Sequence, residues 1–376
     1  MLSHNAAMRW LGAALLLAGC DSLLGEKTTF CPATNAICPS GLVCAGDVTL
    51  CGTPDEVNAC RGTAELGECS SGEAPHGYCT SAICTACDPN FSWCHYGGWS
   101  QMTYAGPDLY SIWPLAKNDI YVSGDPGAVY HYDGSKWDAL PSEGGDKLKS
   151  LWASSASDLF AVDGGMAIRH FDGSSWTATT LTYLNAVWGS GPRDVYAVGK
   201  NGAVRHYDGS TWSTQNPGVG ANLLGVWGTD ATQVFIAGTF NIVKSSGAGT
   251  WTSSLQDPSA DFVAIWGTSG TDMYAAANCE LGTCTGAFVR HYNGSMWEPA
   301  TIVPIAPTAL LTDIWTAADG MPFVSVDDGT IFRLEGTTWV KQMLDNPNTL
   351  KAIRGTAPDD VYSVGTPGVI WHYEGM

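Results

Sequence analysis

The chain is built mainly from one tandem repeat, which the copy from Leu184 to Trp212 shows clearly: LNAVWGSGPRDVYAVGKNGAVRHYDGSTW. Two tryptophan positions mark the copies and together hold 13 of the 16 tryptophans. The first position holds Trp113, Trp152, Trp188, Trp227, Trp266 and Trp315, with Arg354 in the seventh copy. The second holds Trp99, Trp137, Trp176, Trp212, Trp251, Trp297 and Trp339. Short apolar segments that recur at such a period predict a propeller or a solenoid.

Each copy divides into four short apolar segments separated by turn signals. In the copy above, Asn201-Gly202 separates the second and third segments, and Asp208-Gly209 follows the third. Both dipeptides accept the positive φ angles of tight hairpins. Four antiparallel strands per copy, without a helical period, predict an all-β fold in which each copy forms one propeller blade.

The two ends of the repeat region complement each other. The seventh copy stops at Met376 and has no fourth-strand tryptophan, so it is one strand short. At the other end, Trp99 has the features of a fourth-strand tryptophan but precedes the first complete copy, so one strand is spare. Pairing these ends would leave no exposed sheet edge. The sequence therefore predicts a seven-bladed β-propeller over residues 97–376, closed by an N-terminal "velcro" strand.

The N-terminus carries an export signal. Arg9 precedes an apolar run that ends at Ala18, which is too short to span a bilayer and is typical of a signal peptide over residues 1–19. The end of this run overlaps Leu17-Ala18-Gly19-Cys20, which resembles the lipobox of bacterial lipoproteins. The resemblance implies lipidation of Cys20, and residues 20–30 would then form a tether. Asp21 resembles an inner-membrane retention signal, but that rule varies between bacteria. We expect an anchor in the outer membrane or at the cell surface.

Residues 31–96 form a separate cysteine-rich segment. Its cysteines are Cys31, Cys38, Cys44, Cys51, Cys60, Cys69, Cys79, Cys84, Cys87 and Cys94. Apolar residues are sparse between them, so disulfides must supply the stability that a core would otherwise give. A redox dithiol or half a zinc site at Cys84 and Cys87 is the alternative, but the surrounding pattern fits neither. We predict a small disulfide-rich module and a further bridge between Cys279 and Cys284.

The repeats are similar to the tryptophan-rich WGS…DVYAVG…HYDG…W propeller repeats of exported lipoproteins from large-genome soil bacteria, most of which have no assigned activity. The resemblance covers nearly three quarters of the chain. The Gly-His and Trp-Asp pairs of WD40 repeats and the tandem glycines of kelch repeats are absent from the sequence. The resemblance therefore implies a fold and a location but no particular ligand.

Charge limits the partners. The formal net charge is −19, which disfavours nucleic acid and anionic lipid, because phosphate binding needs clustered lysine and arginine. Apart from the lipid anchor, we expect a monomer whose partner is a protein or a glycan, and we expect no cofactor.

Two sets of repeated polar residues invite a catalytic or metal-binding interpretation. The histidines of the third strand are His131, His170, His206, His291 and His372. The aspartates before the second strand are Asp119, Asp158, Asp194, Asp272 and Asp360. Equivalent positions lie around a ring and do not converge on one ion. We therefore predict no metal site, imidazoles hydrogen-bonded between blades, and aspartates that bond backbone N–H groups.

A ligand site is better sought where the repeat is irregular. Asp313 stands at a repeat position where the other copies have small residues. In the next copy, Arg354 replaces a tryptophan at a matching strand position, so the two side chains could pair. The insertion from Asn278, which includes Glu280, and a proline-rich link at 298–310 lie nearby in sequence. We hypothesise a ligand sector formed by Asp313, Arg354, Asn278 and Glu280. The alternative is an ion pair that only stabilises ring closure, beside an inert insertion.

Three functions remain open. The first is a surface-displayed binding or scaffold protein for protein or glycan. The second is a polysaccharide hydrolase or lyase, which would need two suitably spaced carboxylates, although Asp313 is the one unusual axial carboxylate in the sequence. The third is a purely structural envelope lipoprotein. We favour binding, and we identify no catalytic residue.

Overall fold

The chain divides between Tyr96 and Gly97 into two compact units. The computed structural model describes seven short strands between residues 29 and 86, and residues 98–375 except 143, 248, 280–285, 343 and 345–347. The predicted signal peptide, Cys20, the tether, Glu280 and Cys284 lie outside the described residues.

In the first unit the described strands pair locally. They are β1 (Thr29–Cys31), β2 (Ala36–Cys38), β3 (Val43–Cys44), β4 (Cys51–Gly52), β5 (Glu68–Cys69), β6 (Gly77–Thr80) and β7 (Ile83–Ala86). The backbone places Cys44 opposite Cys51 and Cys79 opposite Cys84 in antiparallel register. The disulfide framework itself stays a prediction.

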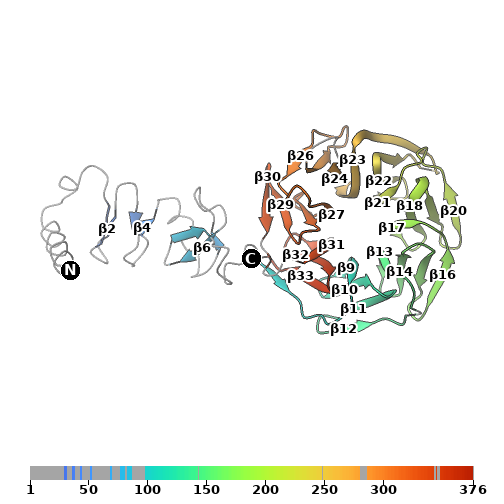
Figure 1. Ribbon diagram of the computed structural model, residues 1–376, viewed down its shortest axis with the longest axis horizontal. Helices are drawn as coiled ribbons and strands as arrows, with labels where there is room; N and C mark the ends of the chain where they lie inside the picture. The colour runs from blue at the N-terminus through green and yellow to red at the C-terminus, as the bar shows by residue number, and fades with distance from the viewer. Residues whose placement is uncertain are drawn as a thin grey trace, which may run out of the picture. The chain divides into compact units, whose positions relative to one another are not determined.

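In the second unit, three four-stranded antiparallel sheets follow one another around a common axis (Figure 1). The first contains β9 (Leu109–Ala116), β10 (Asp119–Gly124), β11 (Ala128–Tyr132) and β12 (Trp137–Ala139). The second contains β13 (Leu148–Ser155), β14 (Asp158–Asp163), β15 (Ala167–Phe171) and β16 (Trp176–Thr180). The third contains β17 (Leu184–Gly191), β18 (Asp194–Gly199), a short 3₁₀ turn η1 (Lys200–Gly202), β19 (Val204–Tyr207) and β20 (Trp212–Gln215).

Three further sheets complete the ring. A six-stranded sheet contains β21 (Leu223–Asp230), β22 (Gln233–Ser245), β23 (Trp251–Ser269), β24 (Asp272–Cys279), β25 (Ala287–Tyr292) and β26 (Thr301–Val303). The next contains β27 (Leu311–Thr316), β28 (Pro322–Val326), β29 (Ile331–Glu335) and β30 (Thr338–Gln342). The last contains β31 (Thr349–Ala357), β32 (Asp360–Thr366), β33 (Val369–Tyr373) and β8 (Trp99–Gln101).

The all-β propeller fold is confirmed, but the prediction of seven blades is wrong, because the described residues of the second unit form six sheets. The fourth and fifth repeats share the six-stranded sheet. In the fourth repeat no Asn-Gly pair separates the second and third segments. The single strand β22 instead turns back at Phe240 (φ 64°), which brings the Lys244 ammonium to 5.0 Å from the centroid of the Phe235 ring.

The strand β23 then serves both repeats. Its first part pairs with β22, as in Trp251↔Ser245, and its second part pairs with β24, as in Trp266↔Tyr274. The pair Thr239↔Asp261 joins the two halves of this sheet. The first strands of all seven repeats nevertheless form one closed series of neighbours. Their order is β9, β13, β17, β21, β23, β27, β31 and back to β9.

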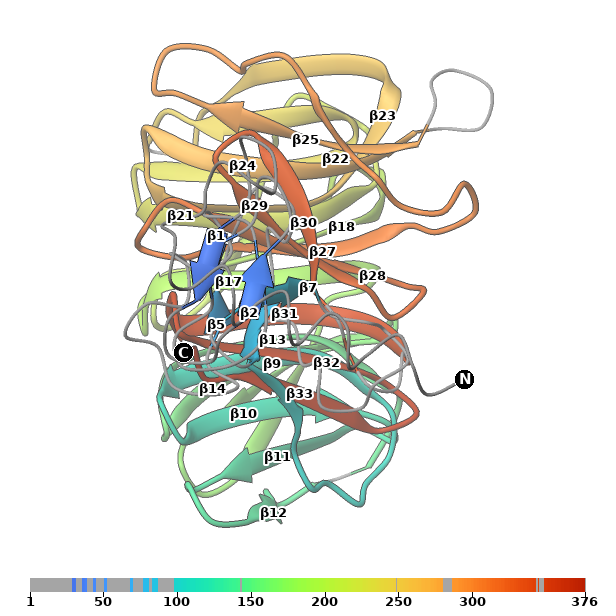
Figure 2. The same cartoon turned by 90° about the vertical axis from the view of Figure 1, so that its left-hand side faces the viewer.

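The last sheet contains strands from both ends of the second unit. β8 pairs with β33 in the register Tyr373↔Trp99, which is the pairing that the sequence predicts for these two segments. The side view shows this sheet lying between the sheet of β27–β30 and the sheet of β9–β12 (Figure 2). Trp99 is 3% exposed, so its side chain is buried like the repeat cores, whereas Ser100 and Gln101 of the same strand are exposed.

The turn between the second and third strands of the third sheet depends on residues that accept positive φ angles. Asn201 and Gly202 both have positive φ angles, 57° and 68°, as the Asn-Gly signal predicts. A Cβ atom on Gly202 would lie 2.0 Å from the carbonyl oxygen of Val219, so glycine is also required for the close approach of the link to β21. The loops at this end of the third sheet are therefore rigidly placed.

Candidate functional site

Five sheets contain the same polar cluster. In each, one histidine Nε2 hydrogen-bonds an aspartate Oδ1 at 2.6–2.8 Å. The pairs are His131–Asp119, His170–Asp158, His206–Asp194, His291–Asp272 and His372–Asp360. Each imidazole also stacks on the second-strand aromatic ring opposite it, with centroids 4.0–4.5 Å apart. These contacts tie the second strand of a sheet to its third.

Two details of the prediction are therefore wrong. The imidazoles bond within one sheet and not between blades, because histidine and aspartate lie two residues apart in the cross-strand register. The aspartates bond side chains where backbone N–H groups were expected. In four of the five clusters the second carboxylate oxygen accepts a hydroxyl hydrogen bond, from Ser154, Ser190, Thr268 and Thr356.

The most buried copy of the cluster is in the last sheet. Asp360 accepts hydrogen bonds from Thr356 and Tyr362 as well as bonding His372. Burial would raise the pKa of Asp360, but the hydrogen bonds with these three side chains outweigh burial and lower it. Burial and the bond to Asp360 raise the pKa of Tyr362. The cluster therefore holds an ionised carboxylate in the interior.

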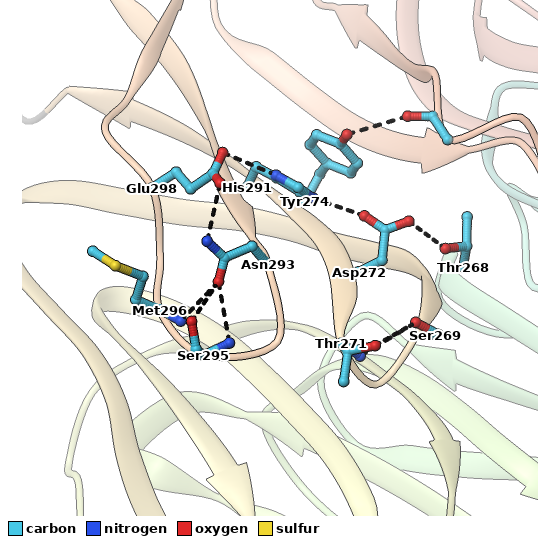
Figure 3. Close-up of polar contacts among 11 residues, drawn as sticks. Thr268, Ser269, Thr271, Asp272, Tyr274, His291, Asn293, Ser295, Met296 and Glu298 are labelled. Carbon is cyan, nitrogen blue, oxygen red and sulfur yellow. Dashed lines mark hydrogen bonds and ion pairs between the residues drawn. The ribbon is translucent and has the colours of Figure 1, made fainter.

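In the fifth repeat the imidazole lies between two carboxylates (Figure 3). His291 Nε2 is 2.7 Å from Asp272 Oδ1, and His291 Nδ1 is 3.1 Å from Glu298 Oε2. Thr268 donates to the other oxygen of Asp272. The hydrogen bond from His291, followed by that from Asn293, lowers the pKa of Glu298.

The order of groups in this cluster does not suit nucleophilic catalysis. A serine or threonine nucleophile needs an imidazole next to its hydroxyl, with the carboxylate on the far side of the ring. Here the carboxylate of Asp272 separates Thr268 from His291, so the imidazole does not lie beside the hydroxyl. Repetition of the same order in other sheets indicates that the cluster holds strands together.

The predicted ligand sector is brought together in part. Arg354 Nη1 donates to Asp313 Oδ2 at 2.5 Å, and the Arg354 guanidinium lies over the ring of Trp266, 4.4 Å from its centroid. Asn278 exchanges two 2.9 Å hydrogen bonds with the backbone of Leu311, two residues before Asp313. Cys279 is disulfide-bonded. Glu280 falls outside the described residues.

Asp313 accepts a backbone hydrogen bond from the next repeat, as the serines at its position in the first two repeats do. Ser111 Oγ accepts the N–H of Leu151, and Ser150 Oγ accepts the N–H of Val187. Asp313 Oδ2 accepts the N–H of Ile353 in the same way, at 3.0 Å. The carboxylate is thus engaged by backbone and by Arg354, which favours the alternative of a stabilising ion pair.

Sequence reasoning missed a cavity of about 650 Å³ between the first and last sheets. We call it the seam groove. It is lined by residues that include Tyr104, Tyr130, Tyr132, Trp137, His372 and Glu374. The Tyr104 ring meets Tyr130 and Trp137 edge to face, with centroids 5.6 and 5.8 Å apart. The signal was Tyr104, an aromatic residue in the link between β8 and β9 that no repeat position explains.

The seam groove differs from the equivalent junctions between other sheets. At those junctions the fourth-strand tryptophan packs on the second-strand aromatic of the preceding repeat, as Trp212 does on Phe160 and Trp251 on Tyr196. Trp251 Nε1 also donates to Gln215 across the junction. At the seam, Trp137 packs instead on Tyr104, which comes from the link between β8 and β9. Trp137 Nε1 is buried without a hydrogen-bond partner, as are Nε1 of Trp99 and Trp339 at the same repeat position.

The described residues contain neither a metal-ligand cluster nor a membrane-spanning helix. Within the described ranges, no group of three or more His, Cys, Asp or Glu side chains is arranged to hold a metal ion. No helix of the described part is long and apolar enough to cross a membrane.

The chain is similar in fold to solved propellers. A chain described as YCF48 bound to D1 peptide superposes with a TM-score of 0.60 at 13% identity, over 75% of this chain and 98% of that one. YCF48 from Cyanidioschyzon merolae superposes with a TM-score of 0.58 at 15% identity, over 74% of this chain and 98% of the other. At such identities the likeness concerns the fold alone. No protein-family model and no curated protein matches the sequence.

Proposed function

We propose that the protein is a lipid-anchored, extracytoplasmic binding propeller that holds an extended segment of a partner protein in the seam groove. The observation that carries the proposal is the aromatic lining of a cavity of about 650 Å³, where Tyr104 packs on Trp137 in place of the second-strand aromatic found at other junctions. Tyrosine and tryptophan dominate the energetics of protein interfaces, because each offers a large rigid ring and a polar group.

The chemistry of the groove favours a peptide. An extended chain presents a side chain on one face roughly every second residue, and apolar ones would pack against the half-buried rings of Tyr104, Tyr132 and Trp137. The groove volume lies within the range of about 300–1,000 Å³ that is usual for ligand pockets. The solved structure of YCF48 with D1 peptide supports the proposal by showing a propeller of the same fold with a bound peptide.

The location rests on the N-terminal sequence. Arg9, the apolar run and Leu17-Ala18-Gly19-Cys20 support export and lipidation at Cys20. The ten cysteines of residues 31–96 support an oxidising compartment, where a disulfide-rich spacer would hold the propeller away from the membrane. Metabolic labelling with a radioactive fatty acid tests the anchor. Label that persists in a Cys20→Ser variant would contradict it.

The binding proposal is tested with the full chain carrying Cys20→Ser, applied to a peptide array and to a glycan array. We expect hits on the peptide array that a Trp137→Ala variant loses. Trp212→Ala is the matched control, because Trp212 holds the same repeat position, is also half-buried and lies away from the groove. Thermal melts of both variants separate lost binding from lost folding. Hits confined to glycans, or peptide hits that survive Trp137→Ala, would overturn the proposal.

A further inference from the structure

The second and third sheets carry several lysine and arginine side chains that form no ion pair with an acid among the described residues. Elsewhere in the described propeller, arginines are paired with acids, as Arg290 is with Asp257 and Arg333 with Asp319, both at 2.9 Å. Within residues 98–375, gaps excepted, six cations of the second and third repeats have no such ion pair. Arg193 lies against Gly209, and the other five are Lys147, Lys149, Arg169, Lys200 and Arg205. Two acids, Asp146 and Asp163, lie beside this group, but among the described residues neither forms an ion pair with these cations.

These cations lie close together although they are distant in sequence. The positive charges of Lys147 and Lys200 both act on Lys149. Lys200 and Arg205 line one cavity of about 410 Å³ at the end of the third sheet. Arg169 and Arg205 occupy the same position in consecutive sheets, opposite Ala161 and Ala197 respectively.

Two exposed apolar side chains border the same cations. Tyr183 lines the cavity and is 58% exposed, and Met166 is 62% exposed. The N–H of Tyr183 donates to the carbonyl of Gly165, and the carbonyl of Tyr183 accepts the N–H of Lys200. Tyr183 is thereby fixed between the residue next to Met166 and the lysine at the cavity.

Tyr183 is also held in a strained conformation. Its φ angle is 65°, in the left-handed region that bulky residues avoid. The equivalent residue of the fourth repeat, Asn222, does not have a positive φ angle, so the conformation is particular to Tyr183. Strain on a well-exposed aromatic side chain is an observation that points to a function outside the folded core.

The electrostatics around Lys149 favour an anionic partner. Burial, and then the charges of Lys147 and Lys200, lower the pKa of Lys149. The nearby acid, Asp163, opposes this weakly, and its Oδ1 already accepts the backbone N–H groups of Gly165, Met166 and Ala167. A bound carboxylate would relieve the mutual repulsion of the lysines.

We propose that Lys147, Lys149, Arg169, Lys200 and Arg205, with Tyr183 and Met166, form a docking surface for an acidic segment of a partner protein. We call it the Lys-Tyr surface. Arginine, methionine and aromatic residues together are the composition that protein interfaces prefer, whereas bare phosphate or uronate binding would not need the exposed apolar side chains. The surface goes beyond the proposed function, since it shares no residue with the seam groove.

The acidity of the rest of the chain would make this surface selective. A negatively charged partner is repelled by most of an acidic protein and attracted by one cationic region. The attraction is therefore local and should be screened by salt. The apolar contacts of Tyr183 and Met166 should persist when the charge interactions are screened.

The test uses the full chain carrying Cys20→Ser and fluorescence anisotropy of a short labelled peptide composed of Asp, Glu and Leu. We expect binding that weakens at least about tenfold in a Lys149→Gln, Lys200→Gln double variant, because two favourable charge contacts are lost. A Lys341→Gln, Lys351→Gln variant removes two other unpaired lysines and should bind as the parent does. Raising salt from about 0.1 M to about 1 M, which shortens the Debye length from about 10 Å to about 3 Å, should also weaken binding.

Three outcomes would overturn the proposal. They are no binding of the acidic peptide, equal binding of the same peptide with Asn and Gln in place of the acids, and preferential binding of oligogalacturonate, which would mark an anionic glycan site. A Tyr183→Asn variant that binds as the parent does would show that the surface is only a patch of charge. Trp137→Ala should leave this binding unchanged, so failure here and failure of the seam groove are distinguishable.

Discussion

Two regions of the propeller break the repeat with charged residues, and they do so in opposite ways. At the junction of β27 and β31, Asp313 and Arg354 contact each other and Asp313 accepts two backbone N–H groups. At the Lys-Tyr surface, five cations have no ion pair and an exposed tyrosine is strained. A charged residue that departs from the repeat has a structural role when it is hydrogen-bonded or ion-paired within the protein. It marks a candidate binding site when its charge has no partner there.

The largest expected effect concerns the satisfied junction. Asp313→Ala should lower the free energy of unfolding by about 3–5 kcal/mol, because it leaves the Arg354 charge without its partner in a mostly buried site. Urea unfolding followed by tryptophan fluorescence measures this. The double variant Asp313→Ser, Arg354→Trp recreates the Ser111 and Trp152 arrangement and should recover most of the loss. A small effect of Asp313→Ala would mean that the junction is not held by this pair.

A second prediction uses pH at another satisfied carboxylate. The pKa of Asp360 is lowered in the folded state, so its stabilisation is fully present above the unfolded pKa near 4 and is lost as pH falls through the folded value. Asp360→Asn should cost about 1–3 kcal/mol at neutral pH, because His372 loses a charged partner. Its stability should also vary less than that of the parent below pH 4 or so. Parallel acid-unfolding curves for the two proteins would contradict this account.

The third prediction concerns strain at the Lys-Tyr surface. Tyr183→Asn should raise the free energy of unfolding by up to about 1 kcal/mol, since asparagine accepts the left-handed backbone conformation more readily. The measurement is the melting temperature, with Tyr132→Asn as a control at an aromatic residue of ordinary φ. A marked loss of stability would show that Tyr183 is held for packing and not for binding.

The smallest effect concerns charge at the same surface. Lys149→Gln should stabilise the free protein by roughly 0.5 kcal/mol or less, because it removes repulsion from Lys147 and Lys200. The gain should shrink as the pH rises, since the lowered pKa of Lys149 means that the parent loses this charge, and the associated repulsion, at a lower pH than an isolated lysine would. Destabilisation by this change would remove the contrast between the two regions.

Some parts of this molecule could be predicted from the sequence, and others could not. The repeated tryptophans and Asn-Gly turns predicted the propeller, because both follow from local strand and turn chemistry. The pairing of β8 with β33 followed from the spare strand at one end of the repeats and the missing strand at the other. The merging of two repeats into one sheet was missed, since it depends on how β22 turns back at Phe240 and how β23 continues into the next repeat. The strand register predicted the Asp313–Arg354 pair. The backbone N–H groups that also bond Asp313 could be identified only in the structure.

By itself, the sequence determined the repeat, its strands and its turns, because apolar periodicity and glycine placement act over a few residues. Only the tertiary structure decided which polar groups remain without a partner. Lys149 and Lys200 lie 51 positions apart in the numbering of the chain, and Trp137 and Tyr104 lie in different strands or links of the seam. Whether such groups meet a partner depends on the closure of the ring, which brings together residues whose separation along the chain carries no information about their contacts.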